Sequence, residues 1–358
     1  MAGPQTIAPA AATPPLSANP VRSIRLRRTR RTIGLAALMA ALGLLFLLSI
    51  AVGARPIDPA TVWRALVEND GGRDAIIVWQ LRLPRTLLGF LVGLALGLGG
   101  AMVQALTRNP LAGPGLLGIN AGAALLVVLA ISVFGVTSFS GYVWFALAGC
   151  GLTAAIVYAL SGRSDSSVQQ VRLVLAGAAI SACLGAVTGI ITMANSQTFD
   201  SYRFWVVGSL DNRTPDVAFQ VMPVIAVGAV LALALGGRLN ALALGDDVGR
   251  TLGVRLGQVR VLSFIAIALL CGAATAAAGP IGFVGLMVPH AVRLIVGPDW
   301  RWILPYSVLT GPVIVLASDI VGRVVARPGE LEVGIVTAFI GAPVLLWLVI
   351  NHKSAGRR

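Results

Sequence analysis

Long apolar runs, separated by short polar or turn-rich segments, dominate the chain. A helix needs about 20 consecutive apolar residues to cross the hydrocarbon core of a bilayer. Ten runs approach this length and define the predicted spans: Ile33–Val52, Pro84–Leu106, Gly115–Phe134, Tyr142–Leu160, Val171–Ala194, Val217–Gly236, Val261–Gly279, Ile281–Val296, Ile303–Val321 and Val333–Ile350. The pattern predicts one all-α integral membrane domain of ten transmembrane helices over residues 33–350.

The ends of the chain differ from this domain. Met1–Pro20 is rich in Ala and Pro, and Arg22–Arg31 carries six arginines directly before the first apolar run. A signal peptide also places a basic region before an apolar one, but this run is too long and no small-residue cleavage site follows. We therefore expect a disordered, basic, cytoplasmic segment at 1–32, a retained first helix, and a cytoplasmic tail at 351–358.

Composition supports the membrane assignment, and the charge distribution orients it. Hydrophobic residues make up 57% of the chain, charged residues 11%, and the net charge is +13. The predicted inner segments carry 18 of the 27 basic residues but four of the 14 acids, as the positive-inside rule requires. Both termini are then cytoplasmic, and the high net charge needs no nucleic-acid partner to explain it.

Glycine spacing predicts how the second span packs. Gly89, Gly93 and Gly97 recur at every fourth position, and Gly100 follows one turn later, so all four share one helix face. Small residues on one face allow a neighbouring helix to approach closely. We expect a packing seam here rather than a ligand site.

Two glycine-proline breaks suggest an internal repeat. Gly113-Pro114-Gly115 precedes the third span and Gly279-Pro280 precedes the eighth. An offset of five helices gives two halves of opposite orientation, which is the arrangement of inverted-repeat transporters.

Two segments between spans predict short helices. Asp58-Pro59 provides a cap and a first-turn proline for a surface helix through Trp63 and Leu66 on the outer side. The inner segment 239–260 contains the sequence LGDDVGRTLGV, in which the two acids suit the first turn of a helix. Its glycines favour a surface against which another protein packs, and a loop lying on the membrane is the alternative.

Several chemistries find no support in the sequence. No phosphate-binding loop occurs, so we expect no ATPase activity in this chain. Cys150, Cys183 and Cys271 are isolated within spans, and two histidines are too few for a metal relay, so we predict no catalytic residues, no metal site and no bound cofactor. Of these histidines, His290 fits a hydrogen bond to a neighbouring helix better than a substrate contact.

Asp319 is the acid that a proton relay would use. An intramembrane carboxylate can carry protons. It lies four residues before Arg323, however, so an i,i+4 ion pair near the outer surface is the simpler expectation. A proton-coupled transporter and a membrane-embedded enzyme stay as alternatives from other functional classes.

Six ordered motifs resemble a known family, the FecCD permeases of bacterial type II ABC importers for ferric siderophores, haem and cobalamin. The motifs are RLPR at Arg82–Arg85, RNPLAGPGLLG at Arg108–Gly118, RFWVVGSL at Arg203–Leu210, LGDDVGRTLGV at Leu244–Val254, GPIGFVGLMVPHAVR at Gly279–Arg293 and GELEVGIVTAFIGAPVLLWLV at Gly329–Val349. The resemblance covers about residues 33–350 and implies the ten-helix type II permease fold.

The resemblance also implies a mechanism and partners. Two permease subunits, identical or homologous, would enclose a pathway in the plasma membrane. Two cytoplasmic ATPases, which hold the ATP and Mg, would drive it, and an extracytoplasmic siderophore-binding protein would deliver the substrate.

The family pattern assigns roles to individual positions. It implies docking of the binding protein at Arg82, Arg85 and Arg323. It implies a first cytoplasmic gate at Asn109 and Leu111 and a second at Gln170 and Val171, although the second pair departs from the small hydroxyl residues of the cobalamin permease. The implied ATPase-coupling residues are Leu244, Gly245, Asp246, Asp247, Val248, Gly249, Leu252 and Gly253.

The motifs RNPLAGPGLLG and RFWVVGSL are more similar to enterobactin-type ferric siderophore permeases than to cobalamin permeases. A complete iron chelate needs no ligands from the pathway wall, and the sequence offers none. We therefore predict ferric siderophore import, with cobalamin or haem import as the alternative within the family.

Overall fold

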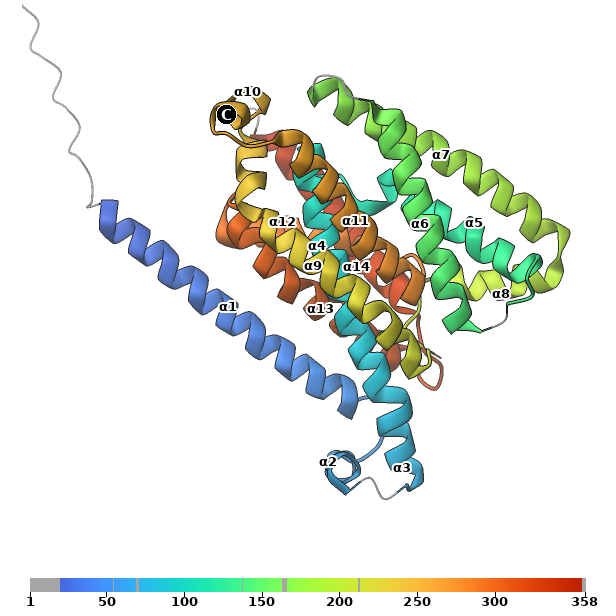
Figure 1. The fold of residues 1–358 in the computed structure, drawn as a ribbon. Coiled ribbons are helices and arrows are strands. Elements are labelled where there is room, and N and C mark those ends of the chain that lie inside the picture. The colour runs from blue at the N-terminus through green and yellow to red at the C-terminus, as the bar shows by residue number, and fades with distance from the viewer. Residues whose placement is uncertain are drawn as a thin grey trace, which may run out of the picture.

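The computed structural model describes residues 20–53, 55–68, 71–136, 138–162, 166–211 and 213–355. Every regular element in these residues is a helix (Figure 1). The elements are α1 (Pro20–Ala51), α2 (Pro59–Glu68), α3 (Arg73–Ile76), η1 (Ile77–Arg82), α4 (Leu83–Thr107), η2 (Pro114–Leu117), α5 (Ile119–Ser132), α6 (Phe139–Ser161), α7 (Ser166–Ala194), α8 (Ser196–Val206), α9 (Pro215–Ala243), α10 (Asp246–Thr251), α11 (Leu256–Ala278), α12 (Val284–Val296), α13 (Trp300–Val325) and α14 (Val333–Ala355). The all-α prediction is confirmed.

Seven of the described helices are long and apolar enough to cross a membrane. Shorter apolar helices cover Ile119–Ser132, Val284–Val296 and Val333–Trp347, where the third, eighth and tenth predicted spans fall. The count of ten membrane crossings stays a prediction, because α5 and α12, with 14 and 13 residues, are shorter than a full span.

The boundaries differ from the prediction at the N-terminus. Helix α1 begins at Pro20, so the arginine-rich residues that we expected to be disordered continue the helix of the first span. Arginine is a good helix former, and the apolar run that follows propagates the same helix. Residues 1–19 and 356–358 lie outside the described residues.

The two glycine-proline breaks each precede a short helix. After the first, the 3-10 turn η2 is followed by Gly118, whose φ is 72°, and α5 then runs for 14 residues. After the second, Gly279 has φ 77° and α12 runs for 13 residues. A positive φ suits glycine, which has no Cβ to clash. These two matched short helices agree with the repeat expectation, which is otherwise untested.

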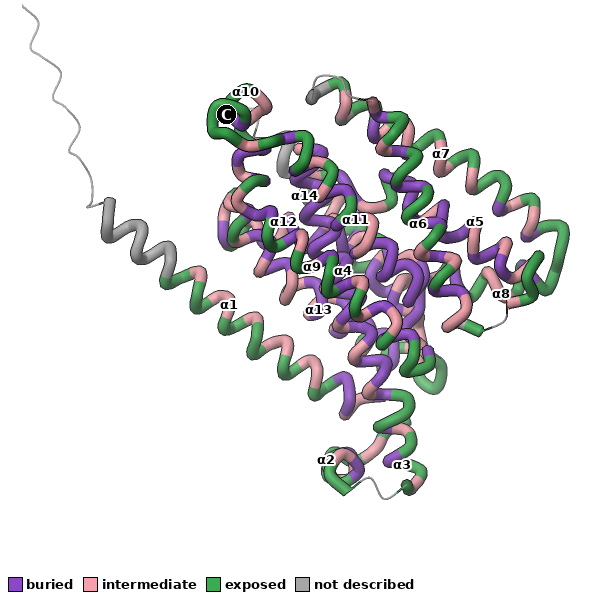
Figure 2. Tube along the Cα trace, viewed as in Figure 1, coloured by how far each residue is buried: buried purple, intermediate pink, exposed green. Residues whose placement is uncertain are grey.

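Helix α4 forms the centre of the bundle, with α13, α11, α12 and α9 around it. Buried residues follow α4 along its length, whereas α1 and α7 are largely exposed (Figure 2). Helices α5 to α8 form a second group beside this centre (Figure 1).

The four glycines of the seam lie against α13 and α12. A Cβ added at Gly93 would approach Pro312 Cα to 2.6 Å, and one at Gly97 would approach the Ser307 carbonyl to 2.6 Å. Gly89 faces Leu316, and Gly100 touches the backbone of Gly285 in α12. The backbones are thus too close for any side chain at Gly93 or Gly97.

Two short helices mark opposite ends of the bundle. Helix α2 lies at the end where α4 begins, and α10 lies at the end where α4 finishes (Figure 1). We call these the α2 end and the α10 end. The predicted surface helix is α2, where Asp58 Oδ2 accepts the Ala60 N–H at 3.1 Å and Trp63 is 69% exposed.

Candidate functional site

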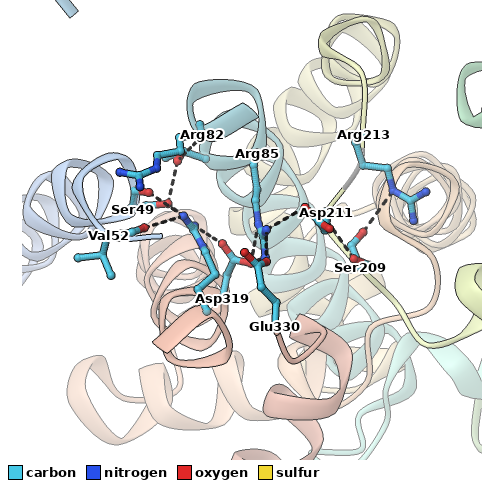
Figure 3. Close-up of polar contacts among 11 residues, drawn as sticks. Ser49, Val52, Arg82, Arg85, Ser209, Asp211, Arg213, Asp319 and Glu330 are labelled. Atoms are coloured by element: carbon cyan, nitrogen blue, oxygen red, sulfur yellow. Dashed lines mark hydrogen bonds and ion pairs between the residues drawn. The ribbon is translucent and has the colours of Figure 1, made fainter. Parts of the chain in front are cut away.

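The arginine pair of the RLPR motif lies at the α2 end, where Arg85 is the centre of an ion-pair network (Figure 3). Arg85 Nε and Nη2 donate to Asp319 Oδ1 of α13 at 3.0 and 2.8 Å. Arg85 Nη1 donates to Asp211 Oδ1 at 3.0 Å and to Glu330 Oε2 at 2.5 Å. One cation therefore joins α4 to α13 and to the segments that follow α8 and α13.

Arg323 holds the other oxygen of the same carboxylate. Its Nη2 donates to Asp319 Oδ2, which is the i,i+4 pair that the spacing predicts. Arg323 Nη1 also donates to the carbonyls of Ser49 and Val52 at 2.8 and 3.0 Å. The last carbonyls of a helix lack partners within it, so this arginine closes the C-terminal end of α1.

Arg82, in η1, also binds carbonyl groups at the C-terminal end of α1. Its Nη1 donates to the carbonyls of Ile50 and Ala51 at 2.8 and 2.7 Å, and its Nη2 donates to the Arg55 carbonyl at 2.7 Å. Two arginines thus satisfy the carbonyl groups at the end of α1, where the helix dipole also favours positive charge.

These contacts bear on the predicted docking role. Arg82, Arg85 and Arg323 are 5%, 8% and 2% exposed, and all three are engaged within the chain. The three arginines are therefore buried and connect helix ends, and their guanidinium groups are not free at the surface. A hollow beside them is lined by Arg55, Asp211 and Glu330 together with the three arginines. Docking at these positions stays a prediction.

Sequence reasoning missed the partners of this network. Asp211 and Glu330 are two of only 14 acids in the chain. Asp211 directly follows the motif RFWVVGSL and Glu330 is the second residue of the motif at Gly329–Val349, so the scarcity of acids was a usable signal. Ser49, whose hydroxyl accepts from Arg323 at 2.7 Å, has no such signal because it lies within an apolar run.

A further arginine, Arg213, lies in the loop before α9 and donates to the Ser209 carbonyl at 3.4 Å (Figure 3). Burial lowers the pKa of its guanidinium to about 10, although Glu332 and Asp211 nearby oppose that shift. Basic groups therefore gather at the α2 end together with acids that largely neutralise them.

The predicted coupling segment forms a short surface feature at the α10 end. Leu244, Val248 and Leu252 are 64%, 45% and 60% exposed, so an apolar patch faces outward. Gly245 and Gly253 flank α10 with φ values of 106° and 75°. Both glycines permit turns that other residues rarely adopt.

Gly249 of the predicted coupling segment does not lie on the outward face. It is buried, and a Cβ there would lie 3.0 Å from Leu256 Cδ2. Gly249 allows α10 to pack on the start of α11, so it supports the patch from beneath. Asp247 is exposed, as expected for a first-turn acid. The coupling role of the segment stays a prediction.

Asp246 is held more firmly than its neighbour. Its Oδ1 accepts from Arg108 Nη2 at 2.7 Å and its Oδ2 accepts from Arg260 Nη2 at 2.5 Å. Burial alone would raise the pKa of the Asp246 carboxyl, but the hydrogen bonds from these two arginines lower it below its ordinary value. The carboxylate is thus charged at neutral pH and anchors α10 to α4 and α11.

The predicted gate residues lie at the same end of the bundle, the first pair in the turn between α4 and η2 and the second pair near the start of α7. Asn109 Oδ1 accepts the Leu111 N–H at 2.9 Å, and Leu111 is 45% exposed beside Phe283 of the α12 start. Val171 is 59% exposed near the start of α7. The side chain of Gln170 lies outside the described residues. The gate roles stay predictions.

Among the described residues no cluster of three or more His, Cys, Asp or Glu could hold a metal ion. His290 lines a pocket between α12 and α14 with Leu111 and Met287. Cys150 and Cys271 are buried and Cys183 is exposed, and all three are free thiols.

A profile of the FecCD transport family matches residues 41–351. The chain belongs to the FecCD transport family. It is therefore a membrane permease of the ABC transporter class rather than an enzyme, and ATP hydrolysis lies with a separate ATPase. The resemblance drawn from the six motifs is confirmed.

Individual relatives match most of the chain. The ferric enterobactin transport system permease protein FepD of Escherichia coli is 44% identical over 91% of this chain and 97% of its own length. The cobalamin import system permease protein BtuC of Halobacterium salinarum is 40% identical over 78% of this chain and 74% of its own. A solved metal-chelate type ABC transporter in an inward-facing conformation has a TM-score of 0.78 at 28% identity, covering 89% of this chain and 99% of that one.

Proposed function

We propose that this chain is the permease subunit of an ATP-driven importer that carries a ferric siderophore across the bacterial plasma membrane by alternating access. The observation that carries the proposal is the 44% identity to the ferric enterobactin permease over almost the full length of both chains. The chemistry agrees with it. A ferric siderophore already saturates its iron, and the described part of this chain offers no ligand cluster to compete for the metal.

The exposed apolar faces support a two-subunit assembly. Helix α7 presents Leu175 and Met193, and α14 presents Phe339 and Trp347, all at least 57% exposed. Apolar side chains on these two helices would line the pathway where a second permease subunit, identical or homologous, faces this one. In this arrangement ten helices cross the membrane, and both termini lie in the cytoplasm.

The α10 end would face the ATPases. The outward patch of Leu244, Val248 and Leu252 is small and apolar, and glycine turns flank the helix that carries it. A patch of this kind fits a groove on a partner surface. Two cytoplasmic ATPases would bind here, one on each permease, and they alone would hold ATP and Mg.

The α2 end would face the extracytoplasmic binding protein. Arg85 is engaged, but two of its acidic partners, Asp211 and Glu330, are 41% and 27% exposed. An acidic side chain of the binding protein could replace either of them on the Arg85 fork at little cost, because one charge-assisted bond is exchanged for another. Docking by exchange keeps the buried Asp319 pair intact.

The alternatives differ in cargo or in energy source. Because one relative is a cobalamin permease, a corrinoid is an alternative cargo. Haem is another, because the family also includes haem importers. A proton-coupled transporter is less well supported, because the buried carboxylate Asp319 is tied to two arginines and so is a poor proton carrier.

Uptake in cells tests the cargo. Cells with and without the chain would be given radio-iron as a panel of ferric siderophores, with labelled cobalamin and haem alongside. Loss of uptake for one or more iron chelates supports the proposal. Loss of cobalamin or haem uptake alone overturns the cargo but keeps the permease, and unchanged uptake of all cargoes contradicts the proposal.

A further inference from the structure

Asp246 stands at a branch point between three parts of the α10 end. As the first residue of α10, it accepts hydrogen bonds from Arg108 at the end of α4 and from Arg260 on α11, at 2.7 and 2.5 Å. Arg260 continues the chain of contacts, because its Nη1 donates to Gln169 Oε1 at 3.0 Å. Gln169 Nε2 in turn donates to the Gly162 carbonyl at the end of α6, at 2.9 Å.

Both branches end beside a predicted gate. Arg108 ends α4 with a left-handed φ of 50°, and Asn109 and Leu111 of the first gate follow it directly. Gln169 directly precedes Gln170 and Val171 of the second gate on α7. No sequence signal joined these positions, because 138 residues separate Arg108 from Asp246 and 91 separate Gln169 from Arg260.

The surroundings favour a firm link. The side chains of Asp246, Arg260 and Arg108 are 13%, 17% and 25% exposed, so solvent and salt screen them less than surface pairs. Arg260 and Gln169 line one small pocket with apolar neighbours from α4, α6, α7 and α11. Charge-assisted hydrogen bonds of this length are about twice as strong as neutral ones.

We propose that Asp246 is a fork that transmits movement of the coupling segment to both gates, through Arg108 to Asn109 and Leu111, and through Arg260 and Gln169 to the start of α7. The inference rests on the proposed function, because it concerns how ATPase movement reaches the pathway. Asp246, Arg108, Arg260 and Gln169 act as positioning residues, since none of them needs to touch the cargo. Because the same carboxylate connects to both gates, a movement of the short helix α10 would shift the two gates together.

The test is the coupling ratio of the whole transporter. The permease, its ATPase and its binding protein would be reconstituted in proteoliposomes, and both cargo imported and ATP hydrolysed would be measured. Asp246→Asn keeps the shape but removes the charge that holds two arginines. We expect ATP hydrolysed per cargo molecule to rise by about fivefold or more, since allosteric couplings of this size are typical. Asp246→Glu should recover part of the wild-type ratio.

Separate variants test each branch. Arg108→Gln and Gln169→Leu should each raise the ratio, and each less than Asp246→Asn. Controls are Asp200→Asn, which removes an exposed carboxylate of α8, and Arg238→Gln, which removes an exposed arginine of α9. Both controls should keep the wild-type ratio. A merely structural role would lower assembly, transport and hydrolysis together and leave the ratio unchanged.

The outcomes separate the two claims. If wild-type proteoliposomes import no cargo with ATP, the proposed function fails and the fork fails with it. If the wild type imports cargo but Arg108→Gln and Gln169→Leu both keep its ratio, only the fork is overturned. If Asp246→Asn does not assemble, the two branch variants decide the question in the same way.

Discussion

At the scale of single residues, Asp319 places a carboxyl group in a position that is 0% exposed. Arg85 holds one of its oxygens and Arg323 holds the other, from two different helices. An isolated buried charge is very costly, and a paired one is tolerated only when its remaining hydrogen-bonding capacity is filled. The three residues are therefore interdependent, and each needs the other two.

Asp319→Asn tests this interdependence. The amide fits the same space but leaves two buried guanidinium groups without their shared anion. Breaking a buried pair in this way costs about 3–5 kcal/mol. We expect a marked fall in the thermal unfolding midpoint of the purified permease in detergent. Asp200→Asn removes an exposed carboxylate as a control, and equal midpoints for both variants would contradict the assignment.

Sequence reasoning reached half of this network. The four-residue spacing of Asp319 and Arg323 predicts their pairing because helical geometry brings i and i+4 together. The contact of Arg85 with Asp319 spans 234 residues and depends on how α4 crosses α13. Local spacing carries no information on that crossing, so the burial of the predicted docking arginines was not foreseen.

At the scale of elements, the four glycines of the packing seam set the distance between α4 and α13. Its spacing alone predicts a packing seam, and the structure supplies the partner helix and the close backbone contacts at Gly93 and Gly97. The partner could not be read from sequence, because any helix with small residues on one face would serve as well.

Gly93→Ala tests this seam. The added Cβ would lie 2.6 Å from Pro312 Cα, and neither backbone can yield without moving a helix. Overpacking of this kind costs about 1–3 kcal/mol. Gly151→Ala in α6 is the matched control, because nothing lies within 4 Å of its added Cβ. We expect a lower thermal midpoint for Gly93→Ala alone; a midpoint equal to that of the control would show that the seam is loose.

The coupling segment shows the same division between pattern and geometry. The acids and glycines of LGDDVGRTLGV predict a short helix, and α10 is that helix. The pattern cannot tell which glycine faces outward, since a six-residue helix has no long period to read. Gly249 is buried, whereas Leu252 and Val248 form the exposed face.

Leu252→Glu tests the exposed face as an ATPase contact. A charge in the centre of an apolar contact should cost about 1 kcal/mol or more, which is roughly a fivefold loss of affinity. We expect less ATPase to co-purify with the tagged permease. Val67→Glu on α2 places the same charge on an exposed apolar residue at the opposite end and should not change recovery. Full recovery with Leu252→Glu would remove the contact.

At the scale of the whole molecule, apolar run length and charge bias predict helical class and orientation from the sequence alone. Helical class is confirmed, because every regular element in the described residues is a helix. Orientation depends on the membrane and not on internal contacts, so it stays a prediction. The short helices α5 and α12 keep the number of crossings open in the same way.

Labelling with an impermeant maleimide tests the orientation. In a Cys183→Ser background, Trp63→Cys at the α2 end should react in intact cells. Arg238→Cys at the α10 end should react only after permeabilisation, since the positive-inside rule places that end in the cytoplasm. The reverse pattern would invert the topology and assign the α10 end to the binding protein.

The most direct measurement of the central claim is ATP-driven import of a ferric siderophore by the reconstituted transporter. Proteoliposomes would contain ATP or a non-hydrolysable analogue, with and without a proton gradient. We predict accumulation of the iron chelate that requires ATP hydrolysis and the binding protein, and that does not change when the proton gradient is collapsed. Accumulation that follows the proton gradient and ignores ATP would contradict the account.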